Sequence, residues 1–365
     1  MISLTLNLFL LFIIFTTSLC ISSSTYDVPT TTIKYSSILG PNLDKLPTQN
    51  ETRKLFQSWM KEHGRVYKNV DEMAKKFNIF KSNLKYITET NAKRKSPHGH
   101  VLGLTNFADW SHQEFKETYL HKNDMSMYNN TMKIKNVNSV SCSAPKSMDW
   151  RSKGVVGSVK NQGTCGSCWT FSAAGAIESI NAIVTGKLVD LSEQEMLDCE
   201  PSGDCNFGYM SKVFDWVLLN KGVALEKNYV YTGRKGVCKS QIPNSESSTF
   251  DTYDLVEKSD NGLLCAVVNH PISVCLYATP DFDHYSHGIY DGPNCPKNSD
   301  ETNHCLLIVG YDSVDDQDYW ILKNSWSTRW GMEGYMYLKR NTNKQYGVCA
   351  INAWGFNLIK HNRKD

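Results

Sequence analysis

Residues 160–173 read KNQGTCGSCWTFSA and place two cysteines, Cys165 and Cys168, three positions apart where a helix is expected to begin. This spacing is compatible with a redox couple, with half of a zinc site, or with a structural cysteine beside a nucleophile. The three possibilities make different demands on the rest of the chain, so the other motifs decide between them.

The first two possibilities find little support. A thioredoxin-like redox pair should follow a strand in a small βαβ unit, but this pair follows WRSKGVVGSVKNQG and many other cysteines accompany it. A zinc site would need a second close pair, and Cys199 and Cys205 are six positions apart. We therefore expect no metal site, and we keep thiol–disulfide exchange only as an alternative.

The third possibility needs a base and a group that orients it. A cysteine is nucleophilic as its thiolate, which an imidazolium and the N–H groups at a helix start would favour at Cys168. His304 stands directly before the apolar stretch CLLIVG, and Asn324 lies in KNSWSTRWG, after another apolar stretch. The Asn324 amide can set the tautomer of His304, while Gln162 and the Cys168 backbone N–H can form an oxyanion hole.

Composition sets the broad class. The chain has 365 residues, 41% hydrophobic and 21% charged, with a formal net charge of +2, which gives no reason to expect nucleic acid or an acidic membrane as partner. Residues 4–15 form an apolar run too short to span a bilayer. Because small residues, Ser18 and Cys20, follow it, we predict a signal peptide at residues 1–20 and a secretory route.

The cysteines divide the chain into two regions. Of twelve, Cys20 leaves with the signal peptide and the other eleven lie from Cys142 onward. The sequons at Asn50 and Asn129, where we predict glycosylation, lie before this break. An exposed early region without disulfides suits a removable propeptide. We place it at residues 21–142, with a core at about residues 55–112, and the mature domain at residues 143–365.

Hydrophobic patterning predicts helices first and strands second. Residues 50–91 show helical spacing, and residues 122–140 read as an exposed linker. CWTFSAAGAIESINAIV, which begins at Cys168, predicts a long buried helix. After about residue 250, apolar stretches alternate with turn residues, as strands do. This order predicts an α+β catalytic unit with two lobes.

Four stretches together carry a family resemblance: NQGTCGSCW, LSEQEMLDC, NHCLLIVGYD and YWILKNSW. On these motifs the chain resembles the papain-like cysteine proteases over nearly all of its length after the signal peptide. The resemblance implies a two-lobed α+β fold with a helical left lobe, a β-barrel-like right lobe and a mainly helical inhibitory prosegment before them.

The same resemblance implies a cysteine endopeptidase made as a zymogen. Cys168, His304 and Asn324 would hydrolyse peptide bonds through an acyl-enzyme intermediate, with proteins or peptides as substrates and no cofactor. The propeptide would be an intramolecular inhibitor, cystatin-type inhibitors are candidate partners, and we expect a monomer. Residues 361–365, HNRKD, are not an ER-retention tail, so we expect a vacuole or lysosome-like compartment or the extracellular space.

The family's disulfides correspond here to three pairs: Cys165–Cys205, Cys199–Cys238 and Cys295–Cys349. Sequence alone would allow fifteen pairings of these six cysteines. The resemblance therefore makes Cys165 a structural cysteine and Cys168 the nucleophile. Cys275 and Cys305 would also be bridged if their Cα atoms lie within about 7 Å.

The prosegment has its own motifs. Six residues fall on one face of a helix, namely Glu72, Lys76, Phe80, Asn83, Ile87 and Asn91, with Lys76 where the family has arginine. A second motif contains Gly103, Phe107 and Asp109, with Thr105 where the family has asparagine. The resemblance implies a segment that crosses the cleft backwards. We expect the two departures to loosen inhibition, and protonation of Asp109 to weaken the segment's binding in acid.

The substrate pocket departs from the family at residues 205–210, CNFGYM, where C-N-G-G is usual. By resemblance, the substrate-binding residues are Phe207, Gly208, Tyr209, Met210, Cys275, Thr302, Cys305, Trp326 and Trp354. Trp354 at the base of the S2 pocket predicts a preference for compact P2 side chains such as Val or Pro. The alternative is that Trp354 only packs in the core.

A second function class is a seed storage or binding protein. RKSPHGH and LGLTNFAD resemble prosegments of the legume-seed branch, some of whose members have lost the nucleophile. Cys168 argues against that function, because a protein without catalysis has no need of this cysteine facing His304.

Overall fold

The computed structural model describes residues 44–120, 141–239, 247–297 and 300–361, all within one compact unit, Lys34–Asp365. The expected signal peptide, Asn129 and the expected linker at 122–140 lie outside the described residues. Asn50 is exposed in the first turn of α1. In the described part of the chain, no helix is both long enough and apolar enough to cross a membrane.

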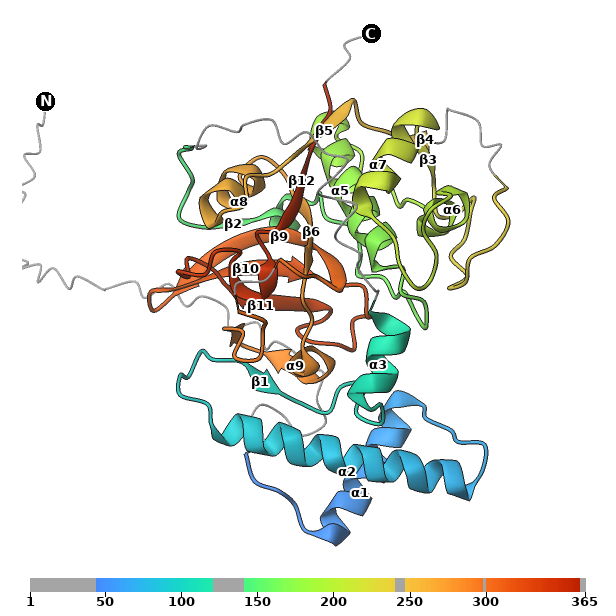
Figure 1. The fold of residues 1–365 in the computed structure, drawn as a ribbon, viewed down its shortest axis with the longest axis vertical. Helices are drawn as coiled ribbons and strands as arrows, with labels where there is room; N and C mark the ends of the chain where they lie inside the picture. Colours follow the sequence, from blue (N-terminus) through green and yellow to red (C-terminus); the bar gives the residue numbers. More distant parts are fainter. Residues whose placement is uncertain (1–43, 121–140, 240–246, 298–299, 362–365) are drawn as a thin grey trace, which may run out of the picture. The chain divides into compact units, whose positions relative to one another are not determined.

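Within residues 44–120 the prosegment is mainly helical, as predicted (Figure 1). Its elements are α1 (Gln49–His63), α2 (Val70–Ala92), β1 (Val101–Leu102) and α3 (His112–Tyr119). The side chains of Thr48, Asn69 and Ser111 cap the three helices by accepting a hydrogen bond from the first turn. An apolar cluster that includes Phe56 and Phe80 joins α1 to α2.

Two asparagines of the predicted helical face bind the chain that follows α2. Asn91 donates to the carbonyl of Leu102 and accepts from its N–H, both at 2.9 Å. Asn83 donates to the carbonyls of Ala108 and Trp110, at 2.9 and 2.8 Å. These side chains satisfy backbone groups that have little access to water, which explains why the face needs amides at these positions.

The part of the chain that we expect to be the mature domain begins with helices. Its elements are β2 (Met148–Asp149), η1 (Trp150–Lys153), α5 (Cys168–Thr185), α6 (Glu193–Cys199), α7 (Met210–Leu219), β3 (Val223–Ala224) and β4 (Ser247–Ser248). The long helix predicted from Cys168 is α5, and it is buried over most of its length. Few polar residues interrupt it because α6, α7 and the sheet pack around it.

Strands dominate the rest of the domain. The elements are β5 (Thr252–Leu255), α8 (Asp260–Val267), β6 (Ile272–Leu276), α9 (Pro280–His284), β7 (Tyr285–His287), β8 (Ile289–Tyr290), β9 (His304–Val314), β10 (Gln317–Lys323), β11 (Tyr335–Lys339), η3 (Val348–Ala350) and β12 (Trp354–Ile359). The main sheet has the order β5-β12-β6-β9-β10-β11-β8, and β1 of the prosegment pairs with β7. In the described residues β5 and β8 do not pair, so the expected barrel-like lobe is an open, largely antiparallel sheet and not a closed barrel.

Five disulfides link the described residues, and Cys168 alone among their cysteines is free. Three are the pairs implied by the family resemblance: Cys165–Cys205, Cys199–Cys238 and Cys295–Cys349. Cys275 and Cys305, whose Cα atoms are 4.0 Å apart, form a fourth. The fifth joins Cys142, the last residue of the propeptide as we delimited it, to Cys265 in α8. The propeptide so delimited is therefore covalently attached to the catalytic domain.

Replacing Asn91 tests how the prosegment is held together. In Asn91→Ala, both buried backbone groups of Leu102 would lose their partner, at about 1–3 kcal/mol for each unsatisfied group. We expect a clearly lower thermal unfolding midpoint for the precursor. Asn78→Ala is the matched control, because Asn78 is exposed on the same helix. Equal midpoints for the two variants would contradict this account.

Candidate active site

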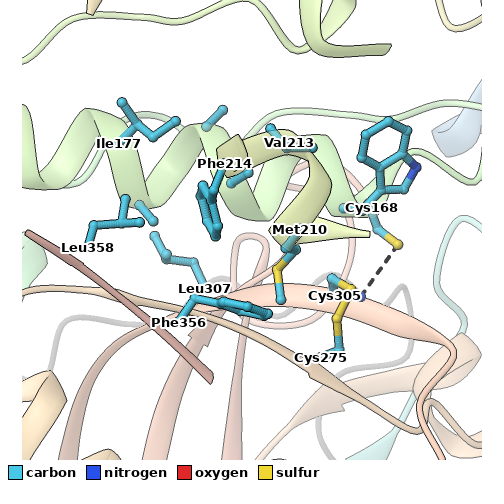
Figure 2. Packing of buried hydrophobic residues seen from close by; sticks show 14 of the residues in the cluster. Cys168, Ile177, Met210, Val213, Phe214, Cys275, Cys305, Leu307, Phe356 and Leu358 are labelled. Atoms are coloured by element: carbon cyan, nitrogen blue, oxygen red, sulfur yellow. Dashed lines mark hydrogen bonds between the residues drawn. A yellow bond between two sulfur atoms is a disulfide. The ribbon is translucent and has the colours of Figure 1, made fainter. Parts of the chain in front are cut away.

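Cys168 is the first residue of α5 and is fully buried. Its Sγ accepts a hydrogen bond from the backbone N–H of Cys305, at 3.4 Å from the nitrogen (Figure 2). Ser167 occupies the cap position but makes no side-chain cap bond. The thiol therefore lies at the positive end of a helix and beside a second N–H donor, both of which favour a negative charge on sulfur.

His304 is the first residue of β9, and its Nε2 lies 2.8 Å from Oδ1 of Asn324. The same oxygen accepts from the N–H of Ser325 at 2.8 Å, which fixes the orientation of the amide. Because Oδ1 can only accept, Nε2 must carry the proton, and Nδ1 is left as an acceptor. No described residue hydrogen-bonds Nδ1. The imidazole ring stacks on Trp326, with centroids 4.4 Å apart.

Gln162 is buried with its amide held from both ends. Its Oε1 accepts from Ser325 Oγ at 2.7 Å and from Trp326 Nε1 at 3.1 Å. Its Nε2 donates to the carbonyl of Cys165 at 2.9 Å and to that of Tyr119 at 3.0 Å. Because two donors fix the oxygen end, Nε2 is directed at a carbonyl of the prosegment.

Aromatic residues of the prosegment cover this region. Phe115 and Phe107 pack edge-on against Trp326, with centroids 5.0 and 5.9 Å apart, and Phe115 stacks on Tyr119. Neither Phe115 nor Tyr119 was predicted from sequence to lie at the site. Their spacing of four on α3 is an amphipathic signal, but it does not tell which surface the helix will cover.

Burial keeps the two candidate catalytic groups uncharged in this state. Desolvation raises the pKa of Cys168 to about 12, although the N–H groups of Cys305, Trp169 and Cys168 act in the opposite direction. Desolvation also lowers the pKa of His304 to about 4 against the effect of Asn324. With the prosegment in place, the pair is therefore a thiol and a neutral imidazole at neutral pH.

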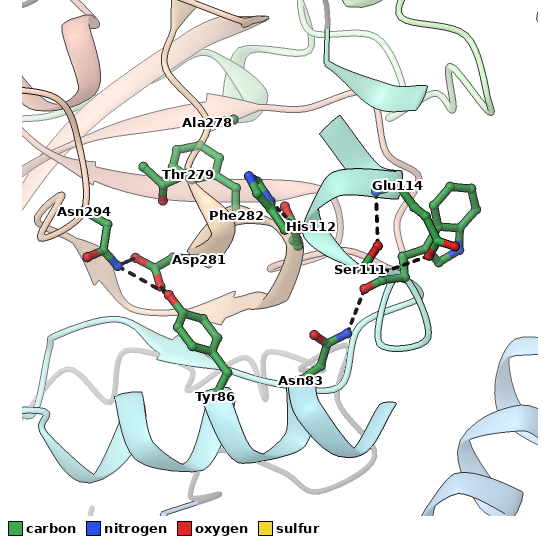
Figure 3. A network of polar contacts seen from close by, with 12 residues as sticks. Asn83, Tyr86, Ser111, His112, Glu114, Ala278, Thr279, Asp281, Phe282 and Asn294 are labelled. Atoms are coloured by element: carbon green, nitrogen blue, oxygen red, sulfur yellow. Dashed lines mark hydrogen bonds and ion pairs between the residues drawn. The ribbon is translucent and has the colours of Figure 1, made fainter. Parts of the chain in front are cut away.

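The prosegment also binds α9 and its surroundings through polar contacts (Figure 3). Tyr86 donates to Asp281 Oδ1 at 2.6 Å, and Asn294 donates to Asp281 Oδ2 at 2.9 Å. His112 Nδ1 lies 2.9 Å from Asp283 Oδ2. The hydroxyl of Thr105 donates to the Asp283 carbonyl at 2.6 Å. Thr105 thus makes a buried contact with the catalytic domain, which argues against our expectation that it loosens inhibition.

Asp109 is a poor candidate for the acid trigger that we expected. Burial raises its pKa despite Arg65 and a hydrogen bond from Tyr67. A raised pKa means that the folded prosegment takes up this proton more readily than the unfolded chain does. Lowering the pH through the pKa of Asp109 therefore stabilises the folded prosegment.

The pKa of Glu114 shifts in the opposite direction to that of Asp109. Burial alone would raise its pKa, but the N–H of Ser111 and the Lys76 ammonium at 3.1 Å outweigh burial and lower it. Ionised Glu114 therefore stabilises the folded prosegment. This stabilisation is fully present at pH values above the ordinary pKa of 4.5, and it is lost as the pH falls through the lowered pKa of the folded state. Lys76, at the position where the family has arginine, supplies this ion pair, so the second departure is also accommodated.

Most of the expected substrate residues belong to the apolar cluster that contains Cys168. Tyr209, Met210, Cys275, Cys305 and Trp354 belong to the same apolar cluster as Cys168, and Figure 2 shows part of it. Trp326 belongs to the second cluster, beneath the prosegment aromatics, and Thr302 is buried just before β9.

Gly208 and Phe207 occupy the loop before α7. A Cβ on Gly208 would lie 2.1 Å from the ring of Trp169, so this position has no room for a side chain. Phe207 is 38% exposed.

Trp354 donates from Nε1 to the carbonyl of Asp300 at 3.3 Å, and the Lys258 ammonium lies 3.8 Å from its ring centroid.

A buried ionic cluster near Asn324 was not predicted. Lys160 Nζ lies 2.7 Å from Glu193 and 3.2 Å from Glu178, and burial raises the pKa of Glu193. A small internal pocket between this cluster and Asn324 is also lined by Lys323. Charged residues so far apart in the chain give no pairing signal in a single sequence.

Among the described residues, no group of acidic, histidine and cysteine side chains could bind a metal ion.

Two family models match the chain. Residues 144–355 match the papain family cysteine protease model, and residues 56–115 match the cathepsin propeptide inhibitor domain (I29). The chain therefore belongs to the papain family of cysteine proteases and carries the family's propeptide inhibitor domain.

Individual relatives agree with this assignment. The P34 probable thiol protease of Glycine max is 45% identical over 334 residues, which cover 87% of this chain and 86% of the relative. A recombinant stem bromelain precursor superposes with a TM-score of 0.74 at 34% identity, covering 85% of this chain and 99% of that one. The bromelain protease of Ananas comosus in complex with the E64 inhibitor gives a TM-score of 0.56 at 38% identity, covering 60% and 100%. The chain is thus a cysteine protease with an inhibitory propeptide, which acts on proteins.

Proposed function

We propose that this protease cleaves peptide bonds with Cys168 as nucleophile, His304 as acid and base, and Asn324 as the group that orients the imidazole. The observation that carries the proposal is the contact of Gln162 Nε2 with the Tyr119 carbonyl at 3.0 Å. A backbone carbonyl already occupies the position beside this buried donor. A substrate carbonyl placed there would have its developing oxyanion within reach of Gln162, and the second donor in this proposal is the Cys168 N–H.

The charged form of the pair requires removal of the prosegment. Burial is the largest cause of both pKa shifts, and the Trp326 ring that stacks on His304 is itself packed against prosegment aromatics. Once water enters, the proton can pass from Cys168 to His304 Nδ1, because Nε2 remains bound to Asn324. The N–H of Cys305 and the start of α5 then stabilise the thiolate.

Catalysis follows from this charge distribution. The thiolate attacks the carbonyl carbon, and the oxyanion receives hydrogen bonds from Gln162 and Cys168. The imidazolium of His304 protonates the leaving amine, which leaves an acyl-enzyme on Cys168. The neutral imidazole then takes a proton from water, whose attack on the acyl-enzyme breaks the bond to sulfur, releases the acid product and restores the thiolate–imidazolium pair.

Substitutions at the site test this mechanism. Cys168→Ala should abolish peptide hydrolysis by the matured enzyme with no change of fold, and His304→Ala should be nearly as severe. Gln162→Ala should lower kcat by about 100-fold, the scale for one oxyanion donor. Near-normal turnover in Cys168→Ser would contradict the proposal, because a serine hydroxyl lacks the acidity that the pair requires.

Alkylation separates the competing functions. Stoichiometric labelling of the matured wild-type protein at Cys168 by an epoxysuccinyl inhibitor supports the protease, and a relative, the bromelain protease, forms a complex with the E64 inhibitor. No labelling would support a storage function, and a second labelled site at Cys165 would support thiol–disulfide exchange. The disulfide of Cys165 with Cys205 favours the first outcome.

Acid release of the prosegment forms the regulatory part of the proposal. Glu114→Gln keeps a side chain that can cap α3 but removes the charge that pairs with Lys76. The stabilisation of the prosegment that wild type loses only in acid is then missing at every pH. Maturation of the Glu114→Gln precursor, monitored by gel electrophoresis, should therefore begin at a higher pH than that of wild type. Glu117→Gln, exposed on the same helix, is the control. An unchanged onset for Glu114→Gln would refute this account.

We also propose that Trp354 limits the P2 side chain. Its cross-strand partner is Cys275, so the indole lies on the same face of the sheet as the Cys275–Cys305 bridge and the apolar cluster around Cys168. A peptide-library profile of the matured enzyme should favour Val or Pro over Phe or Arg at P2. Trp354→Ala should relax this preference by roughly 1–3 kcal/mol. A wild-type preference for P2 Phe or Arg would show the pocket assignment to be wrong.

Further proposals rest on the sequence. A secretory route to a vacuole or lysosome-like compartment or to the extracellular space is supported by the apolar run at residues 4–15 and by the cysteine content. Five disulfides in the described residues fit such a route. We further propose a monomer that cystatin-type inhibitors can block once the prosegment has left.

A further inference from the structure

The disulfide Cys275–Cys305 crosses two neighbouring strands beside the candidate nucleophile. Cys275 of β6 and Cys305 of β9 are directly opposed in the antiparallel register. Their Cα atoms are 4.0 Å apart, close to the spacing of about 4.5 Å of a pair that exchanges no backbone hydrogen bonds. In such a pair the N–H groups point away from the partner strand. This geometry directs the Cys305 N–H toward Cys168.

The bridge is also next to the candidate base. His304, the first residue of β9, is opposite Leu276, the last residue of β6. The disulfide therefore closes the second rung from this end of the strand pair, one residue from His304. The side chain of His304 and the N–H of Cys305 both reach the site from these first two residues of β9.

We propose that the Cys275–Cys305 disulfide is a positioning element of the active site. It keeps the Cys305 N–H hydrogen-bonded to the Cys168 sulfur and holds the neighbouring His304 in the position that proton transfer requires. The inference rests on the proposed function of Cys168 and His304. Neither cysteine reacts with substrate in this scheme. The bridge acts only through the backbone of β9.

The physical need for a cross-link arises from the position of this rung. Hydrogen-bonded elements fray first at their ends, where opening costs little free energy. The β6–β9 register ends at Leu276 and His304, and beyond it Asn303 still hydrogen-bonds to Leu276 and Ala278, so the two active-site residues of β9 lie near the end of the pairing. Small displacements of reacting groups lower turnover strongly. A covalent bond at this rung suppresses such displacements without adding a polar group to the buried cluster.

The test removes the bridge and leaves every backbone N–H in place. Cys275→Ala/Cys305→Ala is the first variant, and Cys275→Val/Cys305→Ala, which keeps the number of side-chain heavy atoms, is the second in case the first does not fold. Cys142→Ala/Cys265→Ala is the matched control, because it also removes one disulfide but neither of its cysteines belongs to the apolar cluster that contains Cys168, Cys275 and Cys305. Each protein is matured, with wild-type enzyme added where self-processing fails.

Two readouts distinguish positioning from general stability and from pocket shape. The first is the pH dependence of Cys168 alkylation by iodoacetamide, a reagent too small to depend on the P2 pocket. The second is kcat/KM against pH for one peptide. We expect the bridge variants to need higher pH for alkylation and to lose kcat/KM by about tenfold or more, while the control stays close to wild type.

The outcomes are separable from those of the proposed function. Alkylation and kcat/KM profiles of a folded bridge variant that match wild type would overturn the positioning role while leaving Cys168 as the nucleophile. Equal losses in the bridge variant and the control would also overturn it, since the effect would then be general destabilisation. A wild-type enzyme without alkylation or turnover would instead overturn the proposed function itself.

Discussion

The site depends on the packing of helix α5 against strand β9. Gly175 allows a close approach here, because a Cβ would lie 3.0 Å from Cδ2 of Leu307 and the leucine side chain would have to shift. Ser172 hydrogen-bonds across the same contact, donating to the Leu306 carbonyl at 2.6 Å. The first residue of α5 is Cys168 and the first residue of β9 is His304. The approach of the two elements therefore brings the starts of α5 and β9 into contact, as the hydrogen bond from the Cys305 N–H to Cys168 Sγ shows.

The prosegment uses the same surface in a different chemical state. It places a carbonyl on Gln162 and aromatic rings on Trp326, whose indole stacks on His304, and in this state burial favours neutral forms of Cys168 and His304. Latency in this precursor thus combines obstruction with desolvation. A competing peptide has to displace buried contacts, and in this state the Cys168 side chain is a thiol and not a thiolate.

Sequence motifs predicted the α+β fold, the helix from Cys168 and the strand from His304 because each depends on local periodicity or on a family pattern. Cross-chain features were less accessible. The open sheet, the partner of Cys142 and the contact of Tyr119 with Gln162 all join segments distant in sequence, and no local pattern encodes which segments meet. Asp109 was misjudged for a similar reason, since its burial decides the direction of its pKa shift.

The link between Cys142 and Cys265 gives the chain a topological property. A cut on the amino side of Cys142 would free the prosegment and leave the new terminus anchored on α8. A cut on the carboxyl side would produce two polypeptides joined by the Cys142–Cys265 disulfide, and they would dissociate only after this bond is reduced. Cys142 is exposed, so reductants can reach this bond. The position of one scissile bond relative to one cysteine thus decides whether prosegment release depends on proteolysis alone or also on the redox state of the compartment.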